Sequence, residues 1–531
     1  MRSATPAIRW SHLAVVLMPT RCSTWRGATL PQPPTIHADP ATLARRFRTW
    51  RAALLGALGL LGAISCSESA SPNPMIPDTG PPGLRVVSGA GVSDTVETAL
   101  PAPLVLELRD SSGHPVNGAG IDIGSLLSAP SDAYVYFSTP SHPSLASYTY
   151  VLTDSNGRVA VSVRLGRQAG RAFIGIYVRE GPADTVTFDV QPGAVARLRA
   201  SPFDTSVFVG GTASYRAYVT DRLGNRRTDT VAAQYQTPSP AVTVSNGGAV
   251  LGAAIGRAFI VVTFGGLIDT QWVSVVPPGR IAAIAGSGEG FIYVLNLDGS
   301  AFDTIANTFD EKHWLHWSPV DSTIVLHRGS SSEAPHLFSV DVAGNWRQVI
   351  TDSPLFGEAR PSYARDGSFI YFLGIDAGTR CDAIWRVRPD GSELGVVATD
   401  GNACGQPFDA PSPSPDGTKL AFLKGDGIRI RTLATSADTM LGVYGGRPWW
   451  SPTGEWIAYD SLGYLNVVHP DGTGAHMLRR AGYPVVKPDW SPDGAWLLYR
   501  GVDELEIVNV QTGLVLPLAV TLGMNDPAWK P

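Results

Sequence analysis

The sequence predicts an all-β protein in which two β-sandwich modules precede a six-bladed β-propeller, closed by pairing of its N- and C-terminal segments. Three observations lead to this prediction. The 531 residues include 57 Gly and 42 Pro but only 16% charged residues, which favours short strands and tight turns over amphipathic helices. A five-residue segment in the middle of the chain recurs 86 residues later. A tryptophan-containing turn motif recurs about every 40 residues in the C-terminal half.

The N-terminal region, residues 1–66, has the features of an export signal. A basic run, RRFRTWR, is followed at 52–64 by an apolar run that is too short for a typical transmembrane helix. The run ends in A-I-S-C, which resembles the lipobox of bacterial lipoproteins. The resemblance implies a signal peptide at 43–66 and lipidation of Cys66. The alternative is a chance cysteine after an ordinary signal.

Two further features concern this region and its surroundings. Residues 1–42 do not fit a signal peptide, and we expect them to reflect a start site placed too early. Residues 67–82 form a Ser/Pro-rich linker. By the lipoprotein resemblance, Ser67 directly after the cysteine favours the outer membrane. The side of that membrane, periplasmic or surface, is not predicted. The chain after Cys66 carries 33 basic and 45 acidic residues, which argues against nucleic-acid binding.

Residues 83–193 and 194–277 are predicted to be two related sandwiches. The segment G-R-A-F-I occurs at Gly170 and again at Gly256. The spacing gives modules of about 80–110 residues, the size of an immunoglobulin-like sandwich. The D-x-x-G-x-P-V, T-D-x-N-G and T-F-x-V-x-P-G motifs of the first resemble bacterial Ig-like domains of the invasin/intimin type. The second resembles a shorter bacterial Ig-like group. The resemblance implies spacer modules; the alternative is adhesion through exposed loops such as 139–147.

The C-terminal half, residues 279–531, contains the repeat. Successive anchors are 46, 50, 37, 40 and 39 residues apart, and three of the six are followed by Ser-Pro and Asp- or Thr-Gly. An apolar strand and an alternating strand follow most anchors, as expected for four-stranded blades. The anchors are Trp317, Tyr363, Pro413, Trp450, Trp490 and Trp529.

The motif has a structural explanation. The indole is large enough to fill the wedge between blades, while Pro and Asp-Gly close the hairpin that follows. The last anchor, Trp529, lacks outer strands, and the strands from Ile281 lack an anchor. Joining the two completes one blade, removes two open sheet edges and gives six blades in total.

The W-S-P-D-G repeats resemble the six-bladed propellers of the TolB family and related WD40-like repeats. The resemblance covers about 250 residues and implies a binding role in the cell envelope, with a protein or glycan partner. The TolB N-terminal domain is absent here, so the particular TolB partner is not implied. We expect a monomer.

Cys381 and Cys404 lie in the longest repeat, and in an exported protein we expect them to form a disulfide. Three loops exceed the minimal repeat and are candidate binding loops or plain solvated connections: Arg328–Pro335, Asp376–Asp382 and Asp400–Phe408. Their ligand is not predicted.

No catalytic motif is present, and we expect neither a cofactor nor a metal. His313 and His316 are the nearest approach to a metal pair, but residues three apart on a strand point to opposite faces. We expect them in interblade packing or on the surface. Two alternatives to a binding protein remain: a propeller enzyme of the metal-dependent lactonase or glycan-cleaving type, and a purely structural envelope component.

Overall fold

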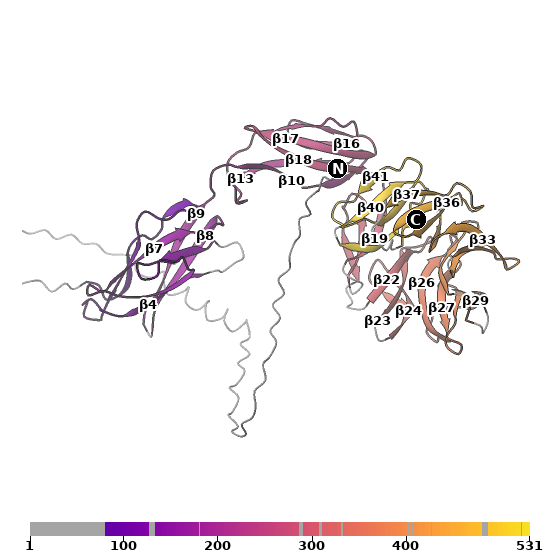
Figure 1. The fold of residues 1–531 in the computed structure, drawn as a ribbon, viewed down its shortest axis with the longest axis horizontal. Coiled ribbons are helices and arrows are strands. Elements are labelled where there is room, and N and C mark those ends of the chain that lie inside the picture. The colour runs from indigo at the N-terminus through magenta and orange to yellow at the C-terminus, as the bar shows by residue number, and fades with distance from the viewer. Residues whose placement is uncertain are drawn as a thin grey trace, which may run out of the picture. The chain divides into compact units, whose positions relative to one another are not determined.

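The computed structural model describes residues 80–531 except 127–132, 180, 286–289, 307–310, 331–332, 401–403, 406, 426, 481–486 and 522. Cys66, the signal region and the linker up to residue 79 lie outside the described residues and remain predictions. Every regular element in the described ranges is a β-strand, which confirms the predicted all-β class (Figure 1). No helix that could span a membrane occurs among these residues.

The first module packs two sheets against each other, with strand orders β1-β3-β7-β5 and β2-β9-β8-β4-β6. Inward residues of both sheets, such as Leu106, Val161, Ile123 and Ile174, share one core. The strands are β1 (Gly83–Ser88), β2 (Ser93–Thr95), β3 (Leu104–Arg109), β4 (Gly120–Leu126), β5 (Val135–Ser138), β6 (Tyr148–Leu152), β7 (Arg158–Leu165), β8 (Gly170–Val178) and β9 (Ala183–Gln191).

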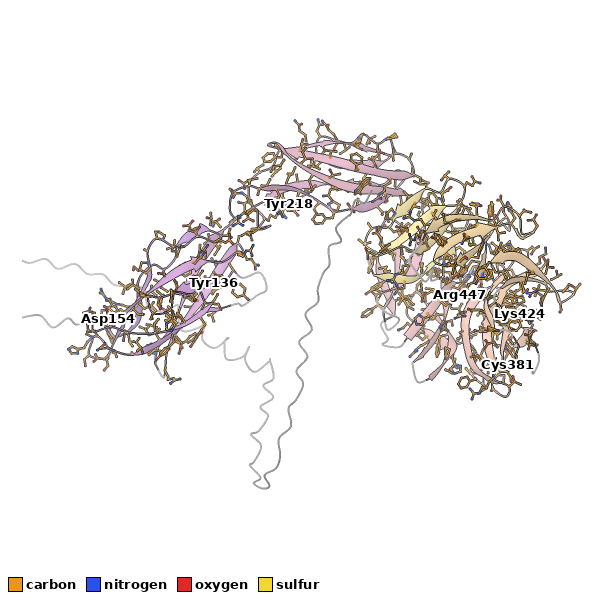
Figure 2. All side chains as sticks on the ribbon, viewed as in Figure 1. Tyr136, Asp154, Tyr218, Cys381, Lys424 and Arg447 are labelled. Carbon is orange, nitrogen blue, oxygen red and sulfur yellow. A yellow bond between two sulfur atoms is a disulfide. The ribbon has the colours of Figure 1, made fainter. Side chains whose placement is uncertain are left out.

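The T-D-S-N-G segment before β7 forms the turn expected of it. The carboxylate of Asp154, labelled in Figure 2, accepts the N–H groups of Asn156 at 2.8 Å and Arg158 at 2.9 Å. Gly157 has a φ of 69°, and a Cβ there would lie 2.5 Å from the carbonyl oxygen of Leu108. The turn therefore requires glycine at this position.

The second module has sheets of order β10-β13, β11-β18-β17-β14 and β12-β16-β15 around a core that includes Tyr215 and Ile260. Its strands are β10 (Arg197–Ser201), β11 (Thr205–Phe208), β12 (Thr212–Ser214), β13 (Arg216–Thr220), β14 (Gln234–Gln236), β15 (Val242–Val244), β16 (Ala249–Gly252), β17 (Gly256–Phe264) and β18 (Leu267–Val276). The two G-R-A-F-I segments begin β8 and β17. Each of these strands pairs antiparallel with the next strand, so the sequence echo marks equivalent hairpins.

Six four-stranded sheets follow, one for each predicted blade. Five run in sequence order: β22–β25, β26–β29, β30–β33, β34–β37 and β38–β41. Their strands are β22 (Glu311–Trp317), β23 (Thr323–Ser330), β24 (Glu333–Asp341), β25 (Trp346–Gln348), β26 (Leu355–Tyr363), β27 (Ile370–Asp376), β28 (Asp382–Val387), β29 (Gly395–Ala398), β30 (Phe408–Pro413), β31 (Lys419–Lys424), β32 (Gly427–Thr432), β33 (Ala437–Tyr444), β34 (Pro448–Trp450), β35 (Ile457–Ser461), β36 (Tyr464–Val468), β37 (His476–Arg480), β38 (Asp489–Trp490), β39 (Trp496–Arg500), β40 (Leu505–Asn509) and β41 (Val515–Pro517).

The sixth sheet closes the ring in the predicted way. Its order is β21-β20-β19-β42, so the last strand, β42 (Met524–Trp529), is paired with the first strands of the propeller, β19 (Arg280–Ala285), β20 (Ile292–Asn296) and β21 (Asp303–Ala306). Ile281 pairs with Trp529 and Ala282 with Ala528. The N–H of Lys530 adds a hydrogen bond of 2.8 Å to the carbonyl of Arg280.

The anchor indoles reach from one blade to the one before it. Trp317 donates its Nε1–H to the carbonyl of Ala528 at 3.1 Å, and Trp490 donates to the carbonyl of Trp449 at 2.9 Å. Both side chains are buried. The indole thus fills the interblade wedge and also hydrogen-bonds across it. Trp450 differs, because it is half-buried and donates to Gly454 within its own turn at 3.4 Å.

The serine of the motif organises the turn. The Ser491 hydroxyl donates to Asp493 at 2.5 Å and accepts the N–H of Trp496 at 2.9 Å. Ser414 does the same with Asp416 at 2.6 Å and Lys419 at 2.9 Å. In each turn the serine hydroxyl therefore supplies an acceptor for the N–H at the start of the second strand.

Candidate functional site

All six blades contribute to a pocket at one end of the propeller's central channel. We name this end the anchor mouth, because the anchors and the Ser-Pro turns surround it. The pocket is open to solvent, and the empty space in and above it amounts to about 620 Å³. Its walls include the anchors Trp317, Tyr363, Pro413, Trp450, Trp490 and Trp529 and the prolines Pro319, Pro415, Pro452, Pro492 and Pro531.

Polar groups enter this pocket from the residues just before four anchors and from one residue after an anchor. His316, Ser362, Ser412 and Asp489 each precede an anchor, and Arg365 follows Tyr363 by two residues. In the other blades, the position of Arg365 holds a proline. The guanidinium of Arg365 is exposed and has no hydrogen bond or ion pair within the described ranges. It is therefore available to a ligand.

The other ionisable groups of the anchor mouth are satisfied internally. Asp489 accepts the N–H of Trp529 at 2.8 Å and lies 3.7 Å from the ammonium of Lys487. Burial lowers the pKa of His316 to about 4, and the nearby Asp489 only partly offsets this effect. The imidazole is therefore neutral at neutral pH.

A repeated bulge shapes the middle of the channel. The residue three positions before the anchor has positive φ in five of the six blades: Trp314, Arg360, Ala410, Lys487 and Asp526. A tryptophan in this conformation is a backbone outlier. In four of these blades, all except that of Lys487, the pairing of the innermost strand shifts register at this residue, as in a β-bulge.

Toward the opposite end, which we name the loop mouth, aromatic and charged side chains pair with each other. Trp314 stacks with Trp449 at a ring distance of 6.3 Å. The guanidinium groups of Arg360 and Arg447 lie 5.4 and 5.3 Å from the Trp314 ring, and both form ion pairs with Asp409. Figure 2 labels Arg447. Each of these two guanidinium groups therefore has a carboxylate partner, whereas Arg365 has none among the described residues.

The two histidines do not come together. His313 lies 3.1 Å from Asp526 through its Nδ1, while His316 lines the pocket at the anchor mouth. Both contact a neighbouring blade, as expected: His313 lies beside Asp526 of β42, and the ring of His316 lies 6.1 Å from that of Tyr363 on β26. In the described part of the chain, no three His, Cys, Asp or Glu residues are grouped to hold a metal ion.

The three predicted candidate loops lie away from the anchor mouth. They connect β23 to β24, β27 to β28 and β29 to β30, at the strand ends opposite the Ser-Pro turns. Cys381 and Cys404 form a disulfide between the second and third loops, with a Cα–Cα distance of 4.8 Å (Figure 2). Beside it lies a space of about 480 Å³ between Asp382 and Phe408. Residues 331–332, 401–403 and 406 of these loops lie outside the described residues.

Sequence reasoning found the anchors but gave them only a structural role. The signal for a site was the departure from the repeat, where Ala-Arg replaces Ser-Pro after Tyr363. A second signal was the variable polar residue before the anchors, as in His316 and Asp489.

No protein-family model matches the chain, and no curated protein sequence matches it. The chain is similar to solved structures of TolB from Acinetobacter baumannii (16% identity, 56% of this chain and 83% of that chain, TM-score 0.42) and of a putative TolB from Agrobacterium tumefaciens (18%, 47% and 92%, TM-score 0.38). It is also similar to a chain of a nidogen/laminin complex (11%, 48% and 99%, TM-score 0.39). Because these TM-scores are below 0.5, the propeller assignment depends on the six sheets and on the pairing of β19 with β42.

Proposed function

We propose that this chain is a non-catalytic envelope lipoprotein whose propeller binds an extended segment of a partner protein at the anchor mouth. The observation that supports this proposal is the exposed guanidinium of Arg365, which has no partner among the described residues, at the rim of a pocket to which all six blades contribute. Ligand pockets typically combine apolar side chains with a few polar or charged groups that fix the orientation of the ligand.

The lining favours a peptide with a carboxylate. Prolines and aromatic rings provide a rigid apolar wall that costs little entropy to occupy, as in grooves that bind extended chains. Arg365 offers two parallel N–H donors to a side-chain or C-terminal carboxylate. Asp489 is the carboxylate of the pocket, and its hydrogen bond to Trp529 makes it part of the framework.

The rest of the chain would place this propeller. We propose that the two sandwich modules are Ig-like spacers and that Cys66 carries the lipid anchor. The disulfide between Cys381 and Cys404 supports export, because such bonds persist outside the cytosol. The outer membrane remains the proposed location.

Capture from envelope extract with immobilised full-length protein tests the binding role. We expect a partner retained by the wild type to be lost with Arg365→Glu and reduced with Trp450→Ala. Arg500→Glu is the matched control, because Arg500 is exposed at the end of β39 away from the anchor mouth. Equal capture by wild type and Arg365→Glu would contradict binding at the anchor mouth, and capture by neither would favour a purely structural component.

A further inference from the structure

One sheet face of the first module exposes three tyrosines together. Tyr148, Tyr150 and Tyr177 have exposed fractions of 57%, 52% and 46%. Tyr148 and Tyr150 alternate with buried residues on β6, so they share the outer face of the sheet. Asp122 of β4 pairs with Tyr150 on one side and with Tyr177 of β8 on the other, which places all three rings around one carboxylate. We name this surface the tyrosine face.

Glycines beneath the rings make this face flat. A Cβ added at Gly120 would overlap the phenol ring of Tyr150, and one added at Gly175 would overlap the ring of Tyr177. Gly124 lies opposite Tyr148 and pairs with Gly175. Two rings therefore lie along the sheet over bare backbone, and each presents one aromatic face to solvent.

The polar groups of this surface are arranged among the rings. The hydroxyl of Tyr148 donates to the Asp122 carboxylate, which lies at the centre of the tyrosine face. Tyrosine hydroxyls at the ring edges can both donate and accept hydrogen bonds. The surface thus combines flat apolar faces with hydrogen-bonding groups in the same plane.

This chemistry fits a sugar chain. The C–H groups on one face of a pyranose carry partial positive charge and are attracted to the negative face of an aromatic ring. The sugar hydroxyls, at the edge of the ring, can donate to a carboxylate such as Asp122. A carboxylate at the centre disfavours an anionic chain. A protein partner would favour a deeper pocket for an anchoring side chain than rings lying flat on glycine provide.

We propose that the tyrosine face is a binding site for a neutral polysaccharide, in which sugar rings stack on Tyr148, Tyr150 and Tyr177 and their hydroxyls bond to Asp122. The first module then has a binding role as well as a spacing role. The site is independent of the anchor mouth.

The test uses full-length protein in mild detergent on a panel of neutral polysaccharides that includes cellulose, chitin and amylose, with polygalacturonate as the anionic comparison. We expect binding to at least one neutral polysaccharide. The triple variant Tyr148→Ala, Tyr150→Ala, Tyr177→Ala should weaken it at least tenfold. Tyr444→Ala, which removes a tyrosine that is 72% exposed on the propeller, should leave it unchanged.

A second variant tests whether the orientation of the rings matters, and not only the presence of the tyrosines. Gly120→Ala keeps every tyrosine but forces the Tyr150 ring off the sheet, so it should also weaken binding, while circular dichroism shows an unchanged fold. Arg365→Glu should have no effect, which separates this site from the anchor mouth. The proposal is overturned by wild-type binding to none of the neutral polysaccharides, by binding to polygalacturonate alone, or by equal binding of the triple variant.

Discussion

The ammonium group of Lys487 lies 3.7 Å from the carboxylate of Asp489, and both belong to a junction of three blades. Lys487 is 1% exposed and also donates to the carbonyls of Leu315 on β22 and Pro527 on β42. One buried cation therefore connects the innermost strands of the first, second and last blades of the ring. The junction exists only because the ring is closed.

Lys487→Met is expected to destabilise the propeller strongly. It leaves two buried carbonyls and Asp489 without the cation, and removing one partner of a buried pair costs about 3–5 kcal/mol. Thermal unfolding followed by tryptophan fluorescence measures the effect, since ten of the fourteen tryptophans follow residue 280. Lys530→Met, which changes a half-buried lysine at the end of the chain, is the comparison and should shift the unfolding temperature much less.

Trp529→Ala tests the closing strand. Trp529 is 2% exposed and packs with Ile281 and Leu297 in one cluster, so its removal should lower the free energy of unfolding by about 3–5 kcal/mol. Trp272→Ala is the control, because Trp272 is 39% exposed and lies in the second module. Similar losses in the two variants would show that Trp529 is not part of the closure.

The first module should lose stability in acid through Glu107. Burial acts to raise the pKa of this carboxyl group, but hydrogen bonds from Arg109, Arg158 and Arg85 outweigh it and lower the pKa from 4.5 to about 2. The resulting stability is fully present above pH 4.5 and is lost as the pH falls toward 2. It amounts to at most about 3 kcal/mol, because Arg85 and Arg158 are half-exposed.

Calorimetry of the unfolding of the first module between pH 7 and pH 2 measures this effect. Glu107→Gln should be less stable at pH 7 and should flatten the pH dependence in that window. Glu97→Gln, which removes a more exposed carboxylate, should keep the wild-type pH profile. An unchanged profile in Glu107→Gln would contradict the assignment.

Removing the disulfide should loosen the propeller near the loop mouth. Cys381 and Cys404 are 23 residues apart, and a closed loop of this length stabilises a fold by about 3 kcal/mol. We expect a reductant to lower the unfolding temperature of the wild type. The double variant Cys381→Ser, Cys404→Ser should have a lower unfolding temperature than the wild type, and reductant should not change it further.

Much of the architecture was predictable because the repeat specifies it locally. The period of the anchors predicted the number of blades. The last unit, at Trp529, lacks outer strands and the strands from Ile281 lack an anchor, which predicted that these two segments pair. The bulge at Trp314 and the reach of Lys487 to Leu315 were not predictable, because they depend on which innermost strands become neighbours when the ring closes.

The sites were less predictable than the fold. Loop length pointed to loops such as Asp376–Asp382, whereas the exposed cation at the anchor mouth is Arg365, inside the repeat motif itself. The alternation of Tyr148 and Tyr150 predicts a strand with one outer face. Strand pairing places glycines of β4 and β8 beneath the rings, and a single sequence does not reveal that pairing.

Photo-crosslinking in living cells tests the central claim, that the anchor mouth is where the propeller meets its partner. A photoreactive amino acid replaces Ser362, which lines the pocket, or Met440, which is 51% exposed on the outermost strand β33. The account predicts a discrete protein adduct from position 362 and none from position 440. An adduct from position 440 with none from position 362 would contradict it.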